Sequence, residues 1–124
     1  MPGPAPAASP LGVKPEHWAV DAGDDDVARL DVPADAYRER RFVVSCSFVV
    51  AHAHRGEAWH EMRVLVNGAQ EWLRREPTHE GVRDSLDTSF RRSVPIGEAL
   101  RLNASTRLAG ARRVSLRISA EEEA

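Results

Sequence analysis

Apolar side chains recur at every second position through most of this chain. In residues 41–53, five apolar or thiol side chains alternate with others that include Ser45 and Ser47. The five are Phe42, Val44, Cys46, Phe48 and Val50. Successive side chains of a β-strand point to opposite sides, so a period of two puts all five on one face. The pattern predicts a long strand with its even-numbered face in the core.

Similar stretches predict further strands on both sides of this one. They cover residues 27–32, 59–66, the region of 72–73, 86–94, 100–105 and 114–119. Asn67-Gly68 favours a type I′ turn, because both residues tolerate positive φ, and we expect a hairpin there. Trp72 on the returning strand then lies beside Arg63. A second turn is expected at Ala109-Gly110.

About seven short strands without a helical period predict an all-β chain. We expect a single antiparallel β-sandwich, immunoglobulin-like or jelly-roll-like, with a small barrel as the alternative. A chain of 124 residues is long enough for one core, and no second domain is expected. The sandwich is assigned to residues 16–120.

The two ends differ in composition from this domain. Residues 1–15 hold five prolines and small side chains, which predicts a disordered tail. Residues 121–124 are expected to form a solvated acidic end. A basic start followed by an apolar run is missing, as is an apolar stretch near twenty residues, so we expect a cytoplasmic protein that does not contact a membrane.

Charge is nearly balanced, with 17 basic and 19 acidic side chains. A net charge of −2 argues against binding to nucleic acid. Lys14 is the single lysine, and we attribute the arginine excess mostly to the composition of a G+C-rich bacterial genome. Arginine pairs at 40–41, 74–75, 91–92 and 112–113 could line up to bind an acidic partner. We favour the reading that they protect strand ends from aggregation.

Three histidines are candidate metal ligands. His52 and His54 are two apart on the expected strand, and the parity of the core places His60 on the inward side as well. A hairpin around Gly56 that sets His54 opposite His60 would gather all three at one end of the interior. They could then bind zinc, iron, copper or nickel with an open position. The competing reading, which we favour, is that they are rim residues that hydrogen-bond to loops or water.

The same region resembles the cupin family. His52-Ala53-His54, followed by Glu61 and Gly68, is similar to the first cupin motif, and 94–97 is similar to the second. The resemblance implies a small β-barrel in which His52 and His54 would be ligands. The second motif's metal-binding histidine is replaced by Leu100, and Glu61 is farther from His54 than is usual in the family.

Specific catalytic patterns are missing from the sequence, which has no glycine-flanked serine elbow, phosphate loop or Cys-x-x-Cys pair. We therefore assign no catalytic residues and expect a non-catalytic binding or interaction module whose partner is an unknown protein or small ligand. The alternative is a degenerate, cupin-like metal-binding protein that uses the inward-facing histidines, and this alternative leaves open whether the protein is an enzyme. A homodimer is a third expectation, because sandwich edges need covering.

Overall fold

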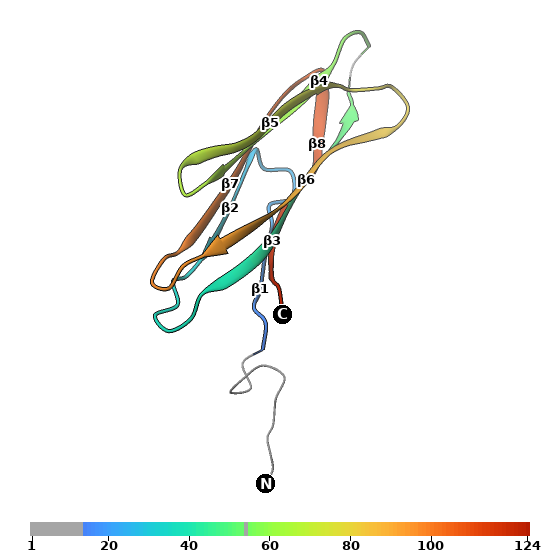
Figure 1. The fold of residues 1–124 in the computed structure, drawn as a ribbon. Helices are drawn as coiled ribbons and strands as arrows, with labels where there is room; N and C mark the ends of the chain where they lie inside the picture. The colour runs from blue at the N-terminus through green and yellow to red at the C-terminus, as the bar shows by residue number, and fades with distance from the viewer. Residues whose placement is uncertain (1–13, 54) are drawn as a thin grey trace.

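The structure, a computed structural model, describes residues 14–53 and 55–124. Every regular element in these residues is a β-strand, and Figure 1 shows the strands arranged in two layers. The strands are β1 (His17–Asp21), β2 (Val27–Val32), β3 (Arg40–His52), β4 (Trp59–Val66), β5 (Ala69–Pro77), β6 (Arg83–Val94), β7 (Leu100–Ala109) and β8 (Ala111–Glu122). The predicted tail lies almost wholly outside the described residues, so its disorder stays a prediction.

The strands form two four-stranded antiparallel sheets, ordered β1-β8-β3-β6 and β2-β7-β4-β5. The strand β1 pairs with β8, β2 with β7, β3 with β6, and β4 with β5. That nested order is the jelly-roll arrangement, in which one long antiparallel ribbon is rolled into two sheets. The all-β sandwich is thus confirmed. The closed barrel is wrong, because each sheet keeps two free edges.

Eight strands are present rather than about seven. The strand that the sequence did not reveal is β1, which has only five residues and no fully buried position. Alternation cannot be recognised over so short a stretch, and its pairing partner β8 lies at the other end of the chain.

Only one connection in the described chain joins neighbours in the same sheet. This is the β4–β5 hairpin, where Asn67 and Gly68 have φ angles of 48° and 85°, as predicted. The expected pairing around Gly56 is wrong, because β3 and β4 belong to different sheets. The turn expected at Ala109-Gly110 is not a hairpin either, because it carries the chain from β7 to β8 in the other sheet. Short glycine-containing loops serve both kinds of connection, and only the partner strands decide between them.

The inward faces follow the predicted parity. In β3 the buried positions alternate, and Phe42, Val44, Phe48 and Val50 have no exposed surface. Cys46 is buried among them, and burial raises the pKa of its thiol to about 12. The thiol is therefore protonated and unreactive at neutral pH.

A β-bulge changes the facing of one tryptophan. The β4–β5 register shifts between Val64 and Leu65, so Trp72 lies opposite Val64 and Leu73 lies opposite Arg63. Trp72 is half-buried against the core, whereas Leu73 is 49% exposed. The prediction that Trp72 lies beside Arg63 is wrong. The extra residue in β5 moves the side chains that follow it to the other face of the sheet.

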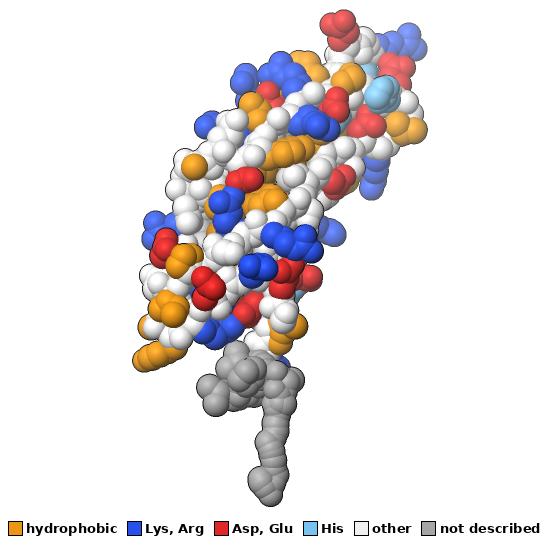
Figure 2. All heavy atoms as spheres, in the orientation of Figure 1, with side chains coloured by type: hydrophobic (Ala, Val, Ile, Leu, Met, Phe, Trp, Pro, Cys, Tyr) orange, Lys and Arg blue, Asp and Glu red, His pale blue; other side chains and the backbone are white. Residues whose placement is uncertain are grey.

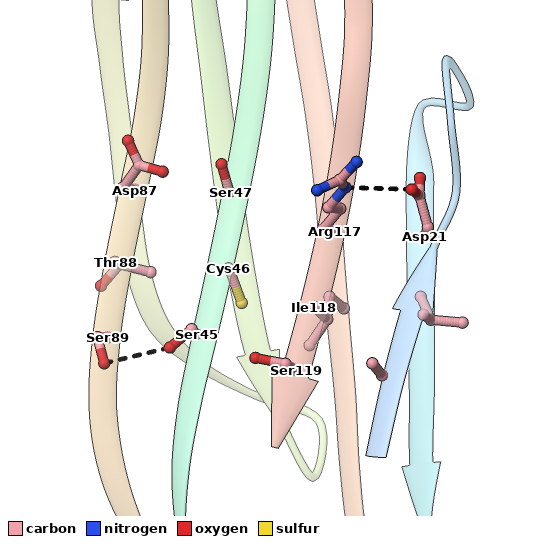
Figure 3. A pocket seen from close by; sticks show the side chains of 12 residues that line it. Asp21, Ser45, Cys46, Ser47, Asp87, Thr88, Ser89, Arg117, Ile118 and Ser119 are labelled. Carbon is pink, nitrogen blue, oxygen red and sulfur yellow. Dashed lines mark hydrogen bonds and ion pairs between the residues drawn. The ribbon is translucent and has the colours of Figure 1, made fainter. Parts of the chain in front are cut away.

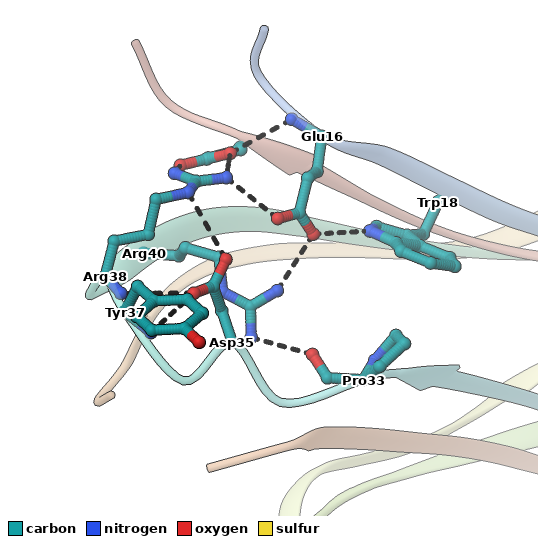
Figure 4. A network of polar contacts seen from close by, with 8 residues as sticks. Glu16, Trp18, Pro33, Asp35, Tyr37, Arg38 and Arg40 are labelled. Carbon is teal, nitrogen blue, oxygen red and sulfur yellow. Dashed lines mark hydrogen bonds and ion pairs between the residues drawn. The ribbon is translucent and has the colours of Figure 1, made fainter. Parts of the chain in front are cut away.

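The chain's acidic end is part of the sheet. The strand β8 continues through Glu122, whose carboxylate binds the Arg38 guanidinium. Arg38 also binds Glu16 at 2.8 Å, and Glu16 binds Arg40 at 2.8 Å (Figure 4). The network ties the residues before β1, the β2–β3 loop and the end of β8 together.

None of the described residues belongs to a helix long and apolar enough to cross a membrane.

Candidate functional site: a serine trough on one sheet

A broad hollow lies on the outer face of the β1-β8-β3-β6 sheet. It encloses about 820 Å³ and is open to solvent along its length. Each of the four strands contributes three consecutive residues to its lining, namely 19–21, 45–47, 87–89 and 117–119 (Figure 3). We call this hollow the serine trough.

The floor of the serine trough is one register row of small side chains. Ser45 on β3 lies opposite Ser89 on β6 and opposite Ser119 on β8. Ser119 in turn lies opposite Ala19 on β1. Neighbouring strands are about 4.8 Å apart, so this row crosses the sheet over roughly 14 Å. The hollow exists because the side chains of this row are small in all four strands.

The next row along the sheet carries charge and one further hydroxyl. Arg117 donates to Asp21 at 3.1 Å, and Ser47 separates Arg117 from Asp87. Asp87 accepts a hydrogen bond from the hydroxyl of Ser85 at 2.6 Å. The lining thus offers hydroxyls, two carboxylates and one guanidinium, and it has no strong net charge.

Sequence reasoning missed this site. Ser45 and Ser47 were recognised only as the outward half of an alternating strand. Ser89 and Ser119 lie 44 and 74 positions after Ser45 in the sequence. Nothing local in the sequence shows that these three serines share a row, because their alignment depends on the register of β3 with both β6 and β8.

The three predicted metal ligands can be placed only in part. His60 is 1% exposed and inward, its Nδ1 is 2.7 Å from Thr78 Oγ1, and its ring meets Phe48 edge-on. Burial lowers the pKa of His60, which keeps the imidazole neutral. His52 is half-buried, with Nε2 at 3.0 Å from the carbonyl oxygen of Gly56. His54 lies outside the described residues.

His52 and His60 come from opposite sheets but lie at the same end of the sandwich. His52 pairs with Ala111 and His60 with Leu108, on either side of the β7–β8 turn. Over residues 14–53 and 55–124, no group of three His, Cys, Asp or Glu side chains is arranged to hold a metal ion. The metal site stays a prediction, because His54 is one of its three ligands.

The predicted arginine pairs do not form a single stripe. Arg40 and Arg92 bind Glu16 and Glu71, while Arg91 binds Glu123. Other arginines are stacked on aromatic rings. The guanidinium of Arg75 lies 3.6 Å from the ring centre of Trp59 and also binds Glu61. Figure 2 shows basic and acidic side chains interspersed over the visible face.

Comparisons with known proteins identify no family. No family model and no curated protein matches the sequence. Among solved structures, the chain is similar to the crystal structure of dimeric latent PorU from Porphyromonas gingivalis, with a TM-score of 0.44 and 12% identity. The alignment covers 90% of this chain and 13% of that chain. A likeness at this level carries no argument about function.

Proposed function

We propose that the chain is a non-catalytic binding module whose serine trough takes a neutral, hydroxyl-rich ligand such as a short oligosaccharide. The observation that carries the proposal is the row of small side chains across all four strands at the floor of this hollow. Concave surfaces with a few convergent polar groups are where small ligands bind.

The polar groups of the lining fit hydroxyl groups better than they fit ionic ligands. Each serine hydroxyl both donates and accepts, as a sugar hydroxyl does. The lining carries both signs of charge. A polyanion would be repelled by the carboxylates of Asp21 and Asp87, and a polycation would be repelled by the guanidinium of Arg117. The ligand that satisfies these groups is neutral and can donate and accept at neighbouring positions.

The trough is also wide and shallow, which suits a flat ligand lying across the strands. Its lining holds no aromatic ring on which a sugar could stack. Binding therefore rests on neutral hydrogen bonds, each with a net contribution of about 0.5–1.5 kcal/mol. We expect dissociation constants of roughly 1 mM, in the range of weak recognition.

The test is an NMR titration of the ¹⁵N-labelled protein with soluble gluco-, xylo-, galacto- and chito-oligosaccharides. We expect saturable shifts of amides in 19–21, 45–47, 87–89 and 117–119 with one of these series. Ser45→Phe fills the floor and should abolish the shifts. Ser105→Phe, on the outer face of the other sheet, is the matched control and should leave them intact.

The proposal fails if no oligosaccharide series shifts these amides, or if Ser45→Phe and Ser105→Phe bind equally well. Aromatic residues favour strands, so neither substitution should unfold the protein.

A second candidate is a degenerate, cupin-like metal-binding protein using His52, His54 and His60, with enzymatic activity as a further step. Two observations support it. The jelly-roll strand order is also the architecture of cupins, and His60 is a buried neutral imidazole, the form that binds metals. Its Nδ1 is held by Thr78, so the other ring nitrogen would be the ligand.

Elemental analysis of untagged protein purified without chelators tests this candidate. We expect near-stoichiometric zinc, iron, copper or nickel that is lost in His54→Ala and kept in His17→Ala, which removes an exposed histidine from β1. Equal metal content in both variants, or none in the parent protein, would exclude the site.

The proposed setting of the module is the bacterial cytoplasm. The free Cys46 thiol is compatible with a reducing compartment. Fractionation of cells that express the full natural gene product, followed by immunodetection, would test it.

A further inference from the structure

The strand β6 is a long and regular sheet edge. It runs over 12 residues and pairs with β3 from Arg83 to Val94 without a register shift. It contains no proline, glycine or lysine. On the same side of the sandwich, the edge strand β5 has both a bulge and Pro77. Natural proteins cover or interrupt edges such as β6, because their free backbone groups pair with other strands.

We propose that β6 pairs antiparallel with β6 of a second copy, about a two-fold axis at Thr88. The proposal concerns self-association and is independent of what the serine trough binds. A two-fold axis normal to the sheet pairs residues on the same face, so residue i meets residue j only when both have the same parity. This restricts the register to axes that pass through a residue.

Charge excludes several of these registers. An axis at Asp87 would set this carboxylate against its own copy and Arg83 against Arg91. An axis at Arg91 would set two guanidinium groups against each other. Like charges directly opposite each other destabilise a sheet. Axes at Leu86 or Phe90 pair fewer residues than an axis near the middle of the strand.

The axis at Thr88 gives favourable pairs along the strand. On the inward side Thr88 meets Thr88, Leu86 meets Phe90, and Asp84 meets Arg92 of the second copy. These are hydroxyl, aliphatic–aromatic and opposite-charge pairs, the kinds that stabilise antiparallel strands. On the outward side Asp87 meets Ser89, and no like charges are opposed.

The Asp84–Arg92 pair uses groups with bonding capacity left. Arg92 binds Glu71 of its own chain through Nη2. Asp84 accepts both of its hydrogen bonds from His79 at Oδ2. No bond to Asp84 Oδ1 is found in the described chain, so this oxygen is the one that would accept from the Arg92 guanidinium of the second copy.

Pairing at β6 would also join the two serine troughs. Ser89, at the end of one trough floor, would lie opposite Asp87 of the second copy. The sheet would become eight-stranded, and the combined trough would be twice as long.

Sedimentation equilibrium over a range of protein concentrations, without ligand, is the first test. Ser89→Asp sets two carboxylates against each other at both symmetric sites, and should weaken the dimer by about 10-fold. Ser89→Lys sets an ammonium against Asp87 and should strengthen it. The side chain is exposed, so both variants should keep the fold of the parent.

The same two variants distinguish a two-fold axis at Thr88 from an axis at Ser89, the other residue near the middle of β6. With the axis at Ser89, both substitutions would oppose like charges and both would weaken the dimer. That result overturns the proposed register. A monomer at all concentrations up to about 1 mM, or a dimer indifferent to both changes, overturns the interface.

Disulfide trapping gives a second readout. Facing residues of antiparallel strands have Cα atoms about 4.5–5.5 Å apart, within the range of a disulfide. Thr88→Cys should therefore form a covalent dimer on oxidation, whereas Ser89→Cys should not. Cys46 lies directly opposite Thr88 on β3 and would compete for the new thiol, so both cysteine variants are made in a Cys46→Ala background. Trapping of Ser89→Cys but not Thr88→Cys would contradict the Thr88 axis.

Discussion

Glu16→Gln should destabilise the protein strongly, because it leaves a buried guanidinium without its counter-ion. The Arg40 side chain is 2% exposed, and its ion pair with Glu16 is the one found for it among the described residues. Removing one partner of a buried pair costs about 3–5 kcal/mol. The Glu16 side chain is 23% exposed, so water offsets part of this cost. We therefore expect a loss of about 3 kcal/mol.

Urea unfolding followed by tryptophan fluorescence measures this loss, and Trp18 reports on the site because its Nε1 donates to Glu16. The urea midpoint should fall without a change in the m-value. The melting temperature should fall by about 10–15 °C. Glutamine keeps one acceptor oxygen for Arg40 and Trp18, but its amide nitrogen cannot accept from Arg38, so the loss includes that hydrogen bond as well as the charge.

A double-mutant cycle tests the reasoning directly. Arg40→Met removes the buried charge while leaving Glu16 bound to Arg38, so adding Glu16→Gln to Arg40→Met should cost much less than Glu16→Gln alone. The coupling energy should exceed about 1.5 kcal/mol. Asp21→Asn is the matched control: it breaks the exposed pair with Arg117 and should cost less than about 1 kcal/mol. A cost below 1 kcal/mol for Glu16→Gln, or a coupling near zero, would refute the buried-charge argument.

Three further outcomes are expected. A guanidinium hydrogen bond holds the pKa of Glu122 below its usual value, so its stabilisation is present above about pH 4.5 and is lost on further acidification. Urea midpoints from pH 6 to 3 should therefore fall less steeply in Glu122→Gln than in the parent. Burial lowers the pKa of His60, so the unfolded state takes up the proton first and stability falls as the pH drops below 6.5; His60→Gln should flatten the midpoints between pH 7 and 5. Gly110→Ala should cost about 1–3 kcal/mol more than Gly81→Ala, measured by urea unfolding. Both glycines have positive φ, but an added Cβ would lie 2.7 Å from a backbone oxygen only at Gly110.

The facing of most core side chains could be predicted from the sequence. Alternation states which side of a strand is buried, whichever strand pairs with it, so the even-numbered positions of β3 and of β4 were placed correctly. The Asn67-Gly68 hairpin was predictable for the same reason, because the turn residues themselves carry the signal.

The sheet to which each strand belongs could not be predicted in this way. The loops at Gly56 and Gly110 resemble hairpin turns in composition, but both carry the chain to the opposite sheet. The bulge that turns Trp72 inward was equally hidden, since one extra residue in β5 has no marker in the sequence. Non-local pairing decides all three features.

The candidate site depends most heavily on such pairing. Ser45, Ser89 and Ser119 become a floor only when β6 and β8 are in register with β3. The inward position of His60 could be predicted, because it depends only on the alternation within β4. Its distance from His54 could not be predicted, because it depends on the β3–β4 connection, which the sequence analysis took for a hairpin.

The outward row at Ser45 differs from its counterpart on the other sheet. There the row through Ser105 includes the long side chain of Arg63. The row through Ser45 has serines on three neighbouring strands, although bulkier residues pack better on a pleated surface. If the serine row served only the fold, Ser45→Phe would leave every property unchanged or raise stability slightly. If it serves recognition, the same substitution leaves stability and the β6 dimer intact and abolishes ligand binding, because Ser45 lies on β3, away from the β6 edge.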